Sequence, residues 1–330
     1  MLTNFIKLIS GYTNDGIVSC ITTNSLSKSY DDIVAVDGIN LDVRSGQVFG
    51  FLGPNGAGKS TTIKLLTTLI QPTGGSITIL GTDAIKHPLK VRNRIGVVLQ
   101  QPSYEPTLTV EKSLEKYGMM WNVDQKQRRD KVEELIASFD LQEIRKKKNE
   151  DLSIGQRRRV QVAREFMHEM ELLFLDEPTS GLDPSARRKL LDFLKNKVKT
   201  GLTIFYTTHV LTEAEYLCDK IAIINKGKII AVDSPDELKN RFGNEKTIKI
   251  HIAGIQQNLL NLLAGIQDCK IDFNSGTNIT IHSNKSELVL MEVLQLLNKN
   301  NVIIEDLSAM PTNLEEIFIK AVNDSNASSA

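Results

Sequence analysis

The sequence predicts an α/β domain over residues 21–243 and a small α+β domain over residues 244–330. In the first range, short β-branched runs alternate with helical stretches, which is typical of α/β proteins. In the second, the expected element order β-α-β-β-α-β-α indicates a ferredoxin-like module. A chain of 330 residues is also longer than one compact domain usually is. Residues 1–20 are expected to be an N-terminal extension, because they hold one short apolar patch that Lys7 interrupts.

The composition restricts the classes of function. Lys and Arg together number 40, as do Asp and Glu, so the net charge favours neither nucleic acid nor an anionic membrane as partner. No apolar run approaches the roughly 20 residues that cross a bilayer. We therefore expect a soluble, cytosolic chain unless a partner brings it to a membrane. Cys20, Cys218 and Cys269 show no C-x-x-C spacing and are expected to be free thiols in a reducing compartment.

A phosphate-binding loop follows the apolar run Val48–Leu52, which is expected to be a buried strand, and precedes a helix over Thr61–Leu66. The loop matches G-x-x-x-x-G-K-[ST] in full. Backbone N–H groups of such a loop converge on phosphate oxygens, and the helix N-terminus adds partial positive charge. Lys59 is placed to bind the β- and γ-phosphates, and Ser60 to offer a hydroxyl to Mg²⁺. The expected nucleotide-binding residues are Gly53, Pro54, Asn55, Gly56, Ala57, Gly58, Lys59, Ser60 and Thr61.

Two later strands end in residues suited to phosphate chemistry. The apolar run Leu172–Leu175 ends in Asp176 and Glu177. Asp176 is expected to bind a hard cation, and Glu177 to orient or deprotonate an attacking water. The strand Leu202–Thr208 ends at His209, which places this histidine on the edge where open α/β sheets bind ligands.

The segment Leu152-Ser-Ile-Gly-Gln156 precedes a helix running through Val160–Ala163. Ser153 and Gln156 have the spacing of a capping box. Gly155 leaves the start of the helix open to close approach, and a helix N-terminus binds anions. For the segment alone, a capped helix without a ligand is an equally good interpretation.

The segment resembles the L-S-G-G-Q signature of the ATP-binding subunits of ABC transporters, with Ile154 in place of the first glycine. The resemblance covers about residues 21–243. It implies that Tyr30 stacks on adenine and that Gln100, after a strand at Ile95–Leu99, reaches Mg²⁺ and the attacking water. It also implies that Ser180-Gly-Leu-Asp183 is a D-loop and that His209 contacts the γ-phosphate.

The resemblance further implies a P-loop ATPase fold that binds ATP and Mg²⁺, with a helical subdomain at about residues 101–150 that touches a membrane partner. In this family two subunits sandwich two ATP molecules. The Lys59 loop of one subunit would then face Ser153, Gly155 and Gln156 of a second ATP-binding subunit, expected to be a second copy of the chain. The apolar patch Tyr117–Trp121 in the subdomain is equally well interpreted as an exposed contact or as internal core.

Three segments, Val34–Ile39, Phe49–Gly56 and Pro311–Ile319, are similar to the daunorubicin-resistance branch of ABC-2-type drug exporters. That likeness implies a single ATP-binding domain that serves a separate membrane permease and carries a small C-terminal domain. The leading hypothesis is therefore an ATP-hydrolysing exporter subunit, held at the inner face of the cell membrane by its permease and driven by ATP-dependent dimerisation.

Two other functions remain as alternatives. A soluble ABC-type ATPase that acts on ribosomes or DNA is disfavoured by the single phosphate loop and by the absence of heptads between Lys59 and Ser153. A P-loop kinase leaves the signature segment and His209 unexplained. The basic clusters Arg145–Lys148 and Arg157–Arg159 have no interleaved aromatic residues, so we interpret them as solvated helix faces and expect no nucleic-acid partner.

The C-terminal module is expected to contain strands at Thr247–Ile252, Lys270–Phe273, Asn278–His282 and Val302–Ile304, and helices at Asn258–Leu263, Leu288–Leu297 and Asn313–Lys320. It holds no cluster with catalytic spacing, which favours an assembly or regulatory role. The last helix carries an apolar stripe that must bury, either on the module's own sheet or on a partner. The stripe consists of Leu314, Ile317, Phe318 and Val322.

Overall fold

A computed structural model describes residues 19–101, 103–242, 246–253, 262–263, 265–267, 269–274, 277–283, 286–310 and 314–327. Contacts divide the chain between Val232 and Asp233 into two units, which are described separately below. The predicted domain boundary at residue 243 and most of the predicted helix at 258–263 lie outside the described residues. Strand β1 begins at Ser19, so Ser19 and Cys20 belong to the first strand and not to the expected N-terminal extension.

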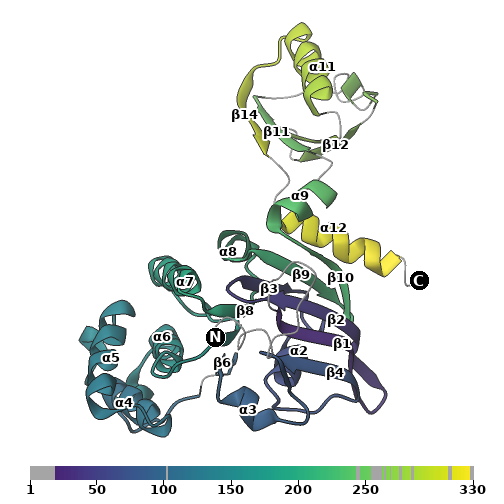
Figure 1. Cartoon of the computed structure of the whole chain (residues 1–330). Coiled ribbons are helices and arrows are strands. Elements are labelled where there is room, and N and C mark those ends of the chain that lie inside the picture. The colour runs from purple at the N-terminus through teal and green to yellow at the C-terminus, as the bar shows by residue number, and fades with distance from the viewer. Residues whose placement is uncertain are drawn as a thin grey trace, which may run out of the picture. The chain divides into compact units, whose positions relative to one another are not determined.

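The first unit contains two sheets and a group of helices (Figure 1). The antiparallel sheet, in the order β2-β1-β4-β5, consists of β1 Ser19–Tyr30, β2 Ile33–Arg44, β4 Gly74–Ile79 and β5 Thr82–Asp83. The other sheet, in the order β10-β9-β3-β8-β7-β6, consists of β3 Val48–Leu52, β6 Ile95–Val98, β7 Leu172–Asp176, β8 Thr203–Thr207, β9 Lys220–Asn225 and β10 Lys228–Asp233. The helices are α2 Lys59–Leu66, α3 Pro88–Arg92, α4 Val110–Met120, α5 Gln125–Ser138, α6 Ile154–Glu165, α7 Pro184–Lys199 and α8 Leu211–Leu217, with 3₁₀ turns at Gln142–Ile144 and Asn149–Asp151.

Parallel pairing in the second sheet determines where the site forms. β3 pairs in parallel with β8, β8 with β7, and β7 with β6, so the carboxyl ends of these strands meet at one edge. Every residue of β3, β7 and β8 is buried, which is why the middle of each strand is apolar on both faces rather than alternating. The α/β fold expected from the sequence is confirmed.

Four phenylalanine rings hold these strands together. The ring of Phe205 on β8 lies 5.7 Å from that of Phe49, 5.4 Å from that of Phe51 and 5.5 Å from that of Phe174. All four side chains are fully buried. Phe205 therefore links β3 to β7, the two strands that carry the phosphate loop and the acidic pair.

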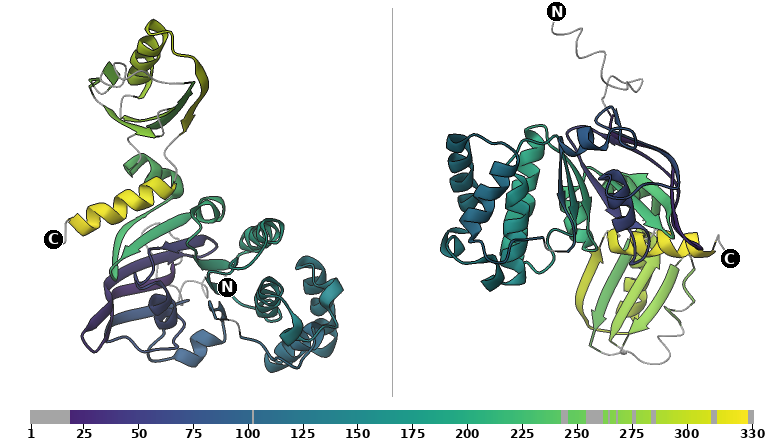
Figure 2. Two further views of the ribbon diagram at one scale, coloured as in Figure 1. Left: turned by 180° about the vertical axis from the view of Figure 1, so that it is seen from behind. Right: turned by 90° about the horizontal axis from the view of Figure 1, so that it is seen from below.

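The helices α4, α5 and α6 lie together on one side of the first unit, and the antiparallel strands lie on the other (Figure 2). The apolar patch Tyr117–Trp121 divides between the two interpretations left open above. The Trp121 ring stacks on the His168 ring at 3.9 Å, and the Tyr117 hydroxyl donates to the buried Glu165 carboxylate. Met119 and Met120 are instead exposed at 59% and 65%.

The second unit has a four-stranded sheet in the order β12-β13-β11-β14, with antiparallel neighbours throughout. This is the strand order of a ferredoxin-like module, as predicted. Its elements are α9 Pro235–Phe242, β11 Lys246–Ile252, β12 Cys269–Asn274, β13 Asn278–Ser283, α11 Ser286–Lys299, β14 Ile304–Met310 and α12 Leu314–Ala327.

Two details of this unit correct the sequence analysis. The predicted strand at Val302–Ile304 is wrong in position, because β14 begins at Ile304. Val302 instead donates its backbone N–H to Leu297 O at the end of α11 and packs against the apolar core. Helix α12, which carries the stripe, packs against α9, a helix that was not predicted from the sequence. Its residues Leu314 and Ile317 are buried.

Two expectations from composition can be compared with the structure. Cys20 and Cys218 are buried free thiols, as predicted, and Cys269 is partly buried. Burial raises the pKa of Cys20 to about 12. In the part of the chain that the structure describes, no helix is long and apolar enough to span a membrane.

Truncation of Phe205 tests the role of the ring cluster. Phe205→Ala should destabilise the first unit by about 3–5 kcal/mol, because it removes a fully buried ring and leaves a cavity between three others. The measurement is the free energy of unfolding from denaturant titration, followed by a probe in the first unit. Leu89→Ala is the control, since Leu89 is 69% exposed and should change stability by less than about 0.5 kcal/mol. Equal losses for both variants would contradict this account.

Candidate functional site

The motif Gly53–Ser60 comprises the loop between β3 and α2 and the first two residues of α2, and it has the geometry of a phosphate cradle. Gly58 caps α2 with a φ of 108°, and a Cβ there would lie 2.5 Å from the carbonyl oxygen of Ala35, so only glycine fits. The buried Lys59 Nζ donates to Gly53 O at 2.7 Å and to Pro54 O at 3.1 Å. Burial lowers the pKa of Lys59, and the carboxylates of Asp176 and Glu177 oppose that shift. The ammonium therefore lies inside the loop beside both acids.

Asp176 ends β7 and joins the phosphate loop to the neighbouring strand. Its Oδ2 accepts from the Ser60 hydroxyl at 3.1 Å, and its Oδ1 accepts from the Thr207 hydroxyl at 2.6 Å. The second bond follows from register, because Asp176 and Thr207 are paired residues of β7 and β8. The side chain is buried and ordered from two sides.

The residues around Asp176 fit a Mg²⁺ ion that is held together with a nucleotide. The hydroxyl of Ser60 and the carboxylate of Asp176 already lie within hydrogen-bond distance, and both are oxygen ligands of the kind that Mg²⁺ prefers. Within the described ranges, no group of three or more His, Cys, Asp or Glu residues could hold a metal on its own. This agrees with the usual Mg²⁺ site, where one or two protein oxygens act with substrate phosphates and water.

Glu177 lies at the centre of the site. Its Oε2 accepts from Gln100 Nε2 at 3.2 Å, and its Oε1 lies 3.3 Å from Nδ1 of His209. The backbone of Glu177 has a φ of 50°. The Glu177 N–H donates to the carbonyl oxygen and to the hydroxyl of Thr207. The structure thus brings together three candidate catalytic side chains from the ends of β6, β7 and β8.

The signature segment has the predicted capping box. The Gln156 N–H donates to the Ser153 hydroxyl at 3.2 Å, and the Ser153 N–H donates to Oε1 of Gln156 at 3.0 Å. Gly155 permits a close approach within the chain itself. A Cβ at Gly155 would lie 2.5 Å from Gly181 O, so a contact with the D-loop of the same chain requires the glycine. Ile154 is 72% exposed and also lies against Gly181.

Two further sequence candidates have clear positions. Tyr30 ends β1 with 45% of its surface exposed, and the Lys28 ammonium lies 5.1 Å from its ring centre. A partly exposed ring is available for stacking on a base, and this role stays a prediction. Asp183 in the D-loop caps α7 by accepting from Ala186 N at 2.9 Å.

Several side chains that hold the site were not predicted from the sequence. Thr207 contacts both acids, and Glu213 accepts hydrogen bonds from Thr179, Tyr206 and Thr208. The interpretation of Arg157–Arg159 as a solvated face is wrong for Arg158, which is 5% exposed. The helical period could have indicated this burial. Residues four positions apart lie on the same face of a helix, and Arg158 precedes the fully buried Val162 by four positions.

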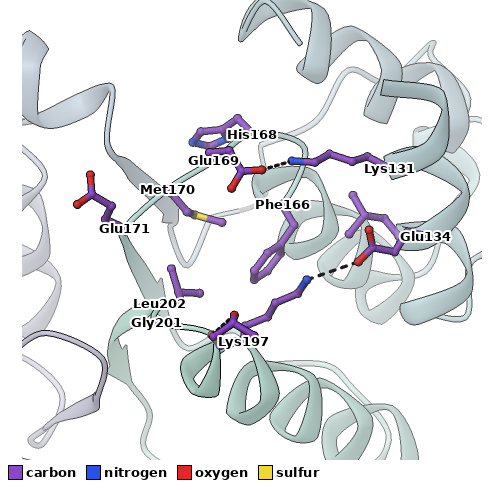
Figure 3. Close-up of a pocket in the computed structure, with 12 residues that line it drawn as sticks. Lys131, Glu134, Phe166, His168, Glu169, Met170, Glu171, Lys197, Gly201 and Leu202 are labelled. Carbon is purple, nitrogen blue, oxygen red and sulfur yellow. Dashed lines mark hydrogen bonds and ion pairs between the residues drawn. The ribbon is translucent and has the colours of Figure 1, made fainter. Parts of the chain in front are cut away.

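A cavity of about 440 Å³ lies elsewhere, where β7 and β8 begin (Figure 3). It is lined by Lys131, Glu134, Leu135, Phe166, His168, Glu169, Met170, Glu171, Lys197, Thr200, Gly201 and Leu202. Ion pairs of 2.7 Å between Lys131 and Glu169 and of 3.5 Å between Lys197 and Glu134 cross its wall. Asp176, Glu177 and His209 lie at or just after the carboxyl ends of these two strands, whereas the cavity lies at their amino ends. The cavity therefore does not belong to the site described above.

The chain is similar to known ATP-binding proteins. The protein-family model for ABC transporters matches residues 36–180, and that for the DrrA1-3-like ATP-binding protein C-terminal domain matches residues 234–322. The linearmycin resistance ATP-binding protein LnrL of Bacillus subtilis is 33% identical over 302 residues, which cover 91% of this chain and 97% of that protein. The daunorubicin/doxorubicin resistance ATP-binding protein DrrA of Streptomyces peucetius is 35% identical over 310 residues, 91% of each chain.

Solved structures show the same fold over about two thirds of this chain. The ATP-binding subunit of an ABC transporter superposes with a TM-score of 0.64 at 28% identity, over 68% of this chain and 93% of that one. The ATP-binding cassette MJ0796, a dimer bound to ADP and Pi, has a TM-score of 0.61 at 25% identity, over 65% of this chain and 98% of that one. The resemblance drawn from the sequence motifs is confirmed. The chain is an ATP-binding ATPase and belongs to the ABC transporter ATP-binding proteins.

Proposed function

We propose that the protein is the ATP-hydrolysing subunit of an ABC-2-type exporter and drives a separate membrane permease by ATP-dependent dimerisation. The observation that carries the ATPase mechanism is the Glu177 carboxylate, held between Gln100 and His209 beside the phosphate loop. The observation that favours export is the match to resistance ATP-binding proteins over both units.

In the proposed mechanism, the backbone of residues 53–61 and the Lys59 ammonium bind the ATP phosphates, with Tyr30 stacked on the adenine. Ser60, Asp176 and Gln100 would hold Mg²⁺, which neutralises charge that develops on the phosphate oxygens. Lys59 exchanges the carbonyl oxygens of Gly53 and Pro54 for phosphate oxygens. These groups position the γ-phosphate for in-line attack.

Glu177 then acts on the attacking water. The water replaces part of the contact between Glu177 and Gln100, the Gln100 amide orients it, and the Glu177 carboxylate accepts its proton. The new bond joins the water oxygen to the γ-phosphorus, while the bond to the β–γ bridging oxygen breaks and ADP leaves. His209, within 3.3 Å of Glu177, contacts the transferred phosphate.

The second ATP-binding subunit in this proposal is another copy of the chain. Ser153, Gly155 and Gln156 form the capped start of α6, whose partial positive charge suits the phosphates bound by the partner's loop. The separate permease would hold the dimer at the inner face of the cell membrane. The C-terminal unit would contribute to assembly. The alternative, action on ribosomes or DNA, requires a nucleic-acid partner instead.

Removal of the Glu177 carboxylate tests the chemistry. Glu177→Gln should retain ATP binding and lower kcat by about 10²- to 10⁴-fold, because the general base is lost. It should also trap an ATP-bound dimer, visible by light scattering. The control is Glu171→Gln, where Glu171 pairs with Arg94 near the start of β7 and should leave kcat unchanged. Normal hydrolysis by Glu177→Gln would exclude the assignment.

A pair of neighbouring substitutions tests the signature. Gly155→Ala should lower ATPase activity and ATP-dependent dimerisation at least about 10-fold, because its Cβ would displace the D-loop carbonyl of Gly181. Ile154→Gly should retain both, at a cost of about 0.5–1 kcal/mol in helix propensity. The measurements are steady-state hydrolysis and dimer formation. A silent Gly155→Ala together with an inactive Ile154→Gly would show that the signature is misaligned.

Cell fractionation separates the exporter from its alternative. The Glu177→Gln chain should sediment with membranes and be released by alkaline carbonate, as expected of a peripheral subunit that its permease holds. Nuclease treatment should leave the membrane fraction unchanged. Sedimentation with ribosomes or the nucleoid that nuclease abolishes would contradict export and favour the alternative.

A further inference from the structure

Arg158 contacts two of the three proposed catalytic residues through their backbone. It lies in the second turn of α6, the helix that begins with the signature, and is 5% exposed. Its Nη2 donates to Gln100 O and to Glu177 O, both at 3.1 Å, and its Nη1 donates to Leu99 O at 2.8 Å. One planar guanidinium therefore bridges the chain after β6 and the chain after β7.

The bond to Glu177 matters because the backbone there is strained. A φ of 50° is uncommon for a residue with a side chain and persists only where neighbours fix it. The backbone N–H of Glu177 donates to Thr207. The backbone carbonyl oxygen of Glu177 accepts from the Arg158 guanidinium and from the Ser180 N–H. Both peptide groups of Glu177 are thus held, and its carboxylate is directed to Gln100.

Other side chains of α6 hold the same segment after β6 but not Glu177. The Gln161 amide donates to Leu99 O and Gln101 O at 3.3 Å and accepts from Nη1 of Arg158 at 2.9 Å. Arg164 donates to Ser103 O at 2.8 Å. Among the described residues of α6, Arg158 alone has hydrogen bonds to both Gln100 and Glu177.

We propose that Arg158 is a positioning residue for ATP hydrolysis, a role that rests on the proposed function of Glu177. It fixes the carbonyls of Gln100 and Glu177 so that their side chains meet around the attacking water. Since it belongs to α6, it also ties this arrangement to the helix whose start forms the anion site. Hydrogen bonds from a charged donor in a buried site are strong, and the planar fork of arginine suits several acceptors at once.

The test compares the ATPase kinetics of full-length Arg158→Met, Arg158→Lys and Arg159→Met. Arg159 is the matched control, because its guanidinium donates to the carbonyls of Phe139 and Asp140 at the end of α5. Arg158→Met should lower kcat by about 10- to 100-fold and change the KM for ATP less than about 3-fold, because the water is misplaced while the phosphate loop is intact. Arg158→Lys should recover part of the loss, and Arg159→Met should keep the kcat of the unchanged protein.

A double variant gives a readout that a purely structural role would not move. Adding Arg158→Met to Glu177→Gln should lower kcat less than about 3-fold further, because Arg158 acts through the missing carboxylate. A full additional loss would overturn the proposal, as would a normal kcat in Arg158→Met or an equal loss in Arg159→Met. If Arg158→Met does not fold, a folded Arg158→Lys with normal kcat overturns it. Failure of the proposed function is seen separately, as normal hydrolysis by Glu177→Gln alone.

Discussion

The hydroxyl of Thr207 is the point on which the geometry of the site depends. It donates to Asp176 at 2.6 Å and accepts from the N–H of Glu177 at 3.2 Å, so one side chain of β8 orders both acids of β7. That is possible only because β7 and β8 pair in parallel with Asp176 opposite Thr207. The same pairing is fixed further along by the ring of Phe205 between Phe49 and Phe174. The apolar core of the sheet thus sets the distance between the phosphate loop and the acids.

Rigid and adjustable parts of the site come from different elements. The phosphate loop and the acids follow fully buried strands, whose close packing leaves little freedom. Gln100 and His209 follow the ends of strands, in loops, and His209 keeps 61% of its side chain exposed. Fewer contacts hold loop residues than residues of a buried strand. The carboxylate of Glu177, which follows a buried strand, contacts both of these loop residues.

Much of the candidate site could be predicted because its residues belong to short local sequence patterns. The loop Gly53–Ser60, the acids after β7 and the histidine after β8 follow from strand, turn and helix signals that span a few residues. The capping box of Ser153 and Gln156 was predictable for the same reason. The ferredoxin-like strand order of the second unit also followed from the order of elements.

What the sequence could not provide are contacts between distant segments. Thr207 lies within an apolar run, and its bond to Asp176 depends on strand order. The sequence indicates a close approach at Gly155, but it does not show that Gly181, 26 positions further along, makes one. β14 was misplaced because Val302, the first residue of the β-branched run, packs against the core as a loop residue, whereas the strand begins only at Ile304 and continues to Met310. Each error concerns a partner that only the tertiary fold supplies.

The helix α6 shows how one element serves two parts of the site. Its N-terminus carries the capped signature, with partial positive charge directed outward. Its buried face holds the carbonyl oxygens of Leu99 and Gln100 through Arg158 and Gln161. The same element therefore joins the capped signature to the carbonyl oxygens of Gln100 and Glu177. On the proposed function, α6 contacts both the anion site and the residues around the attacking water.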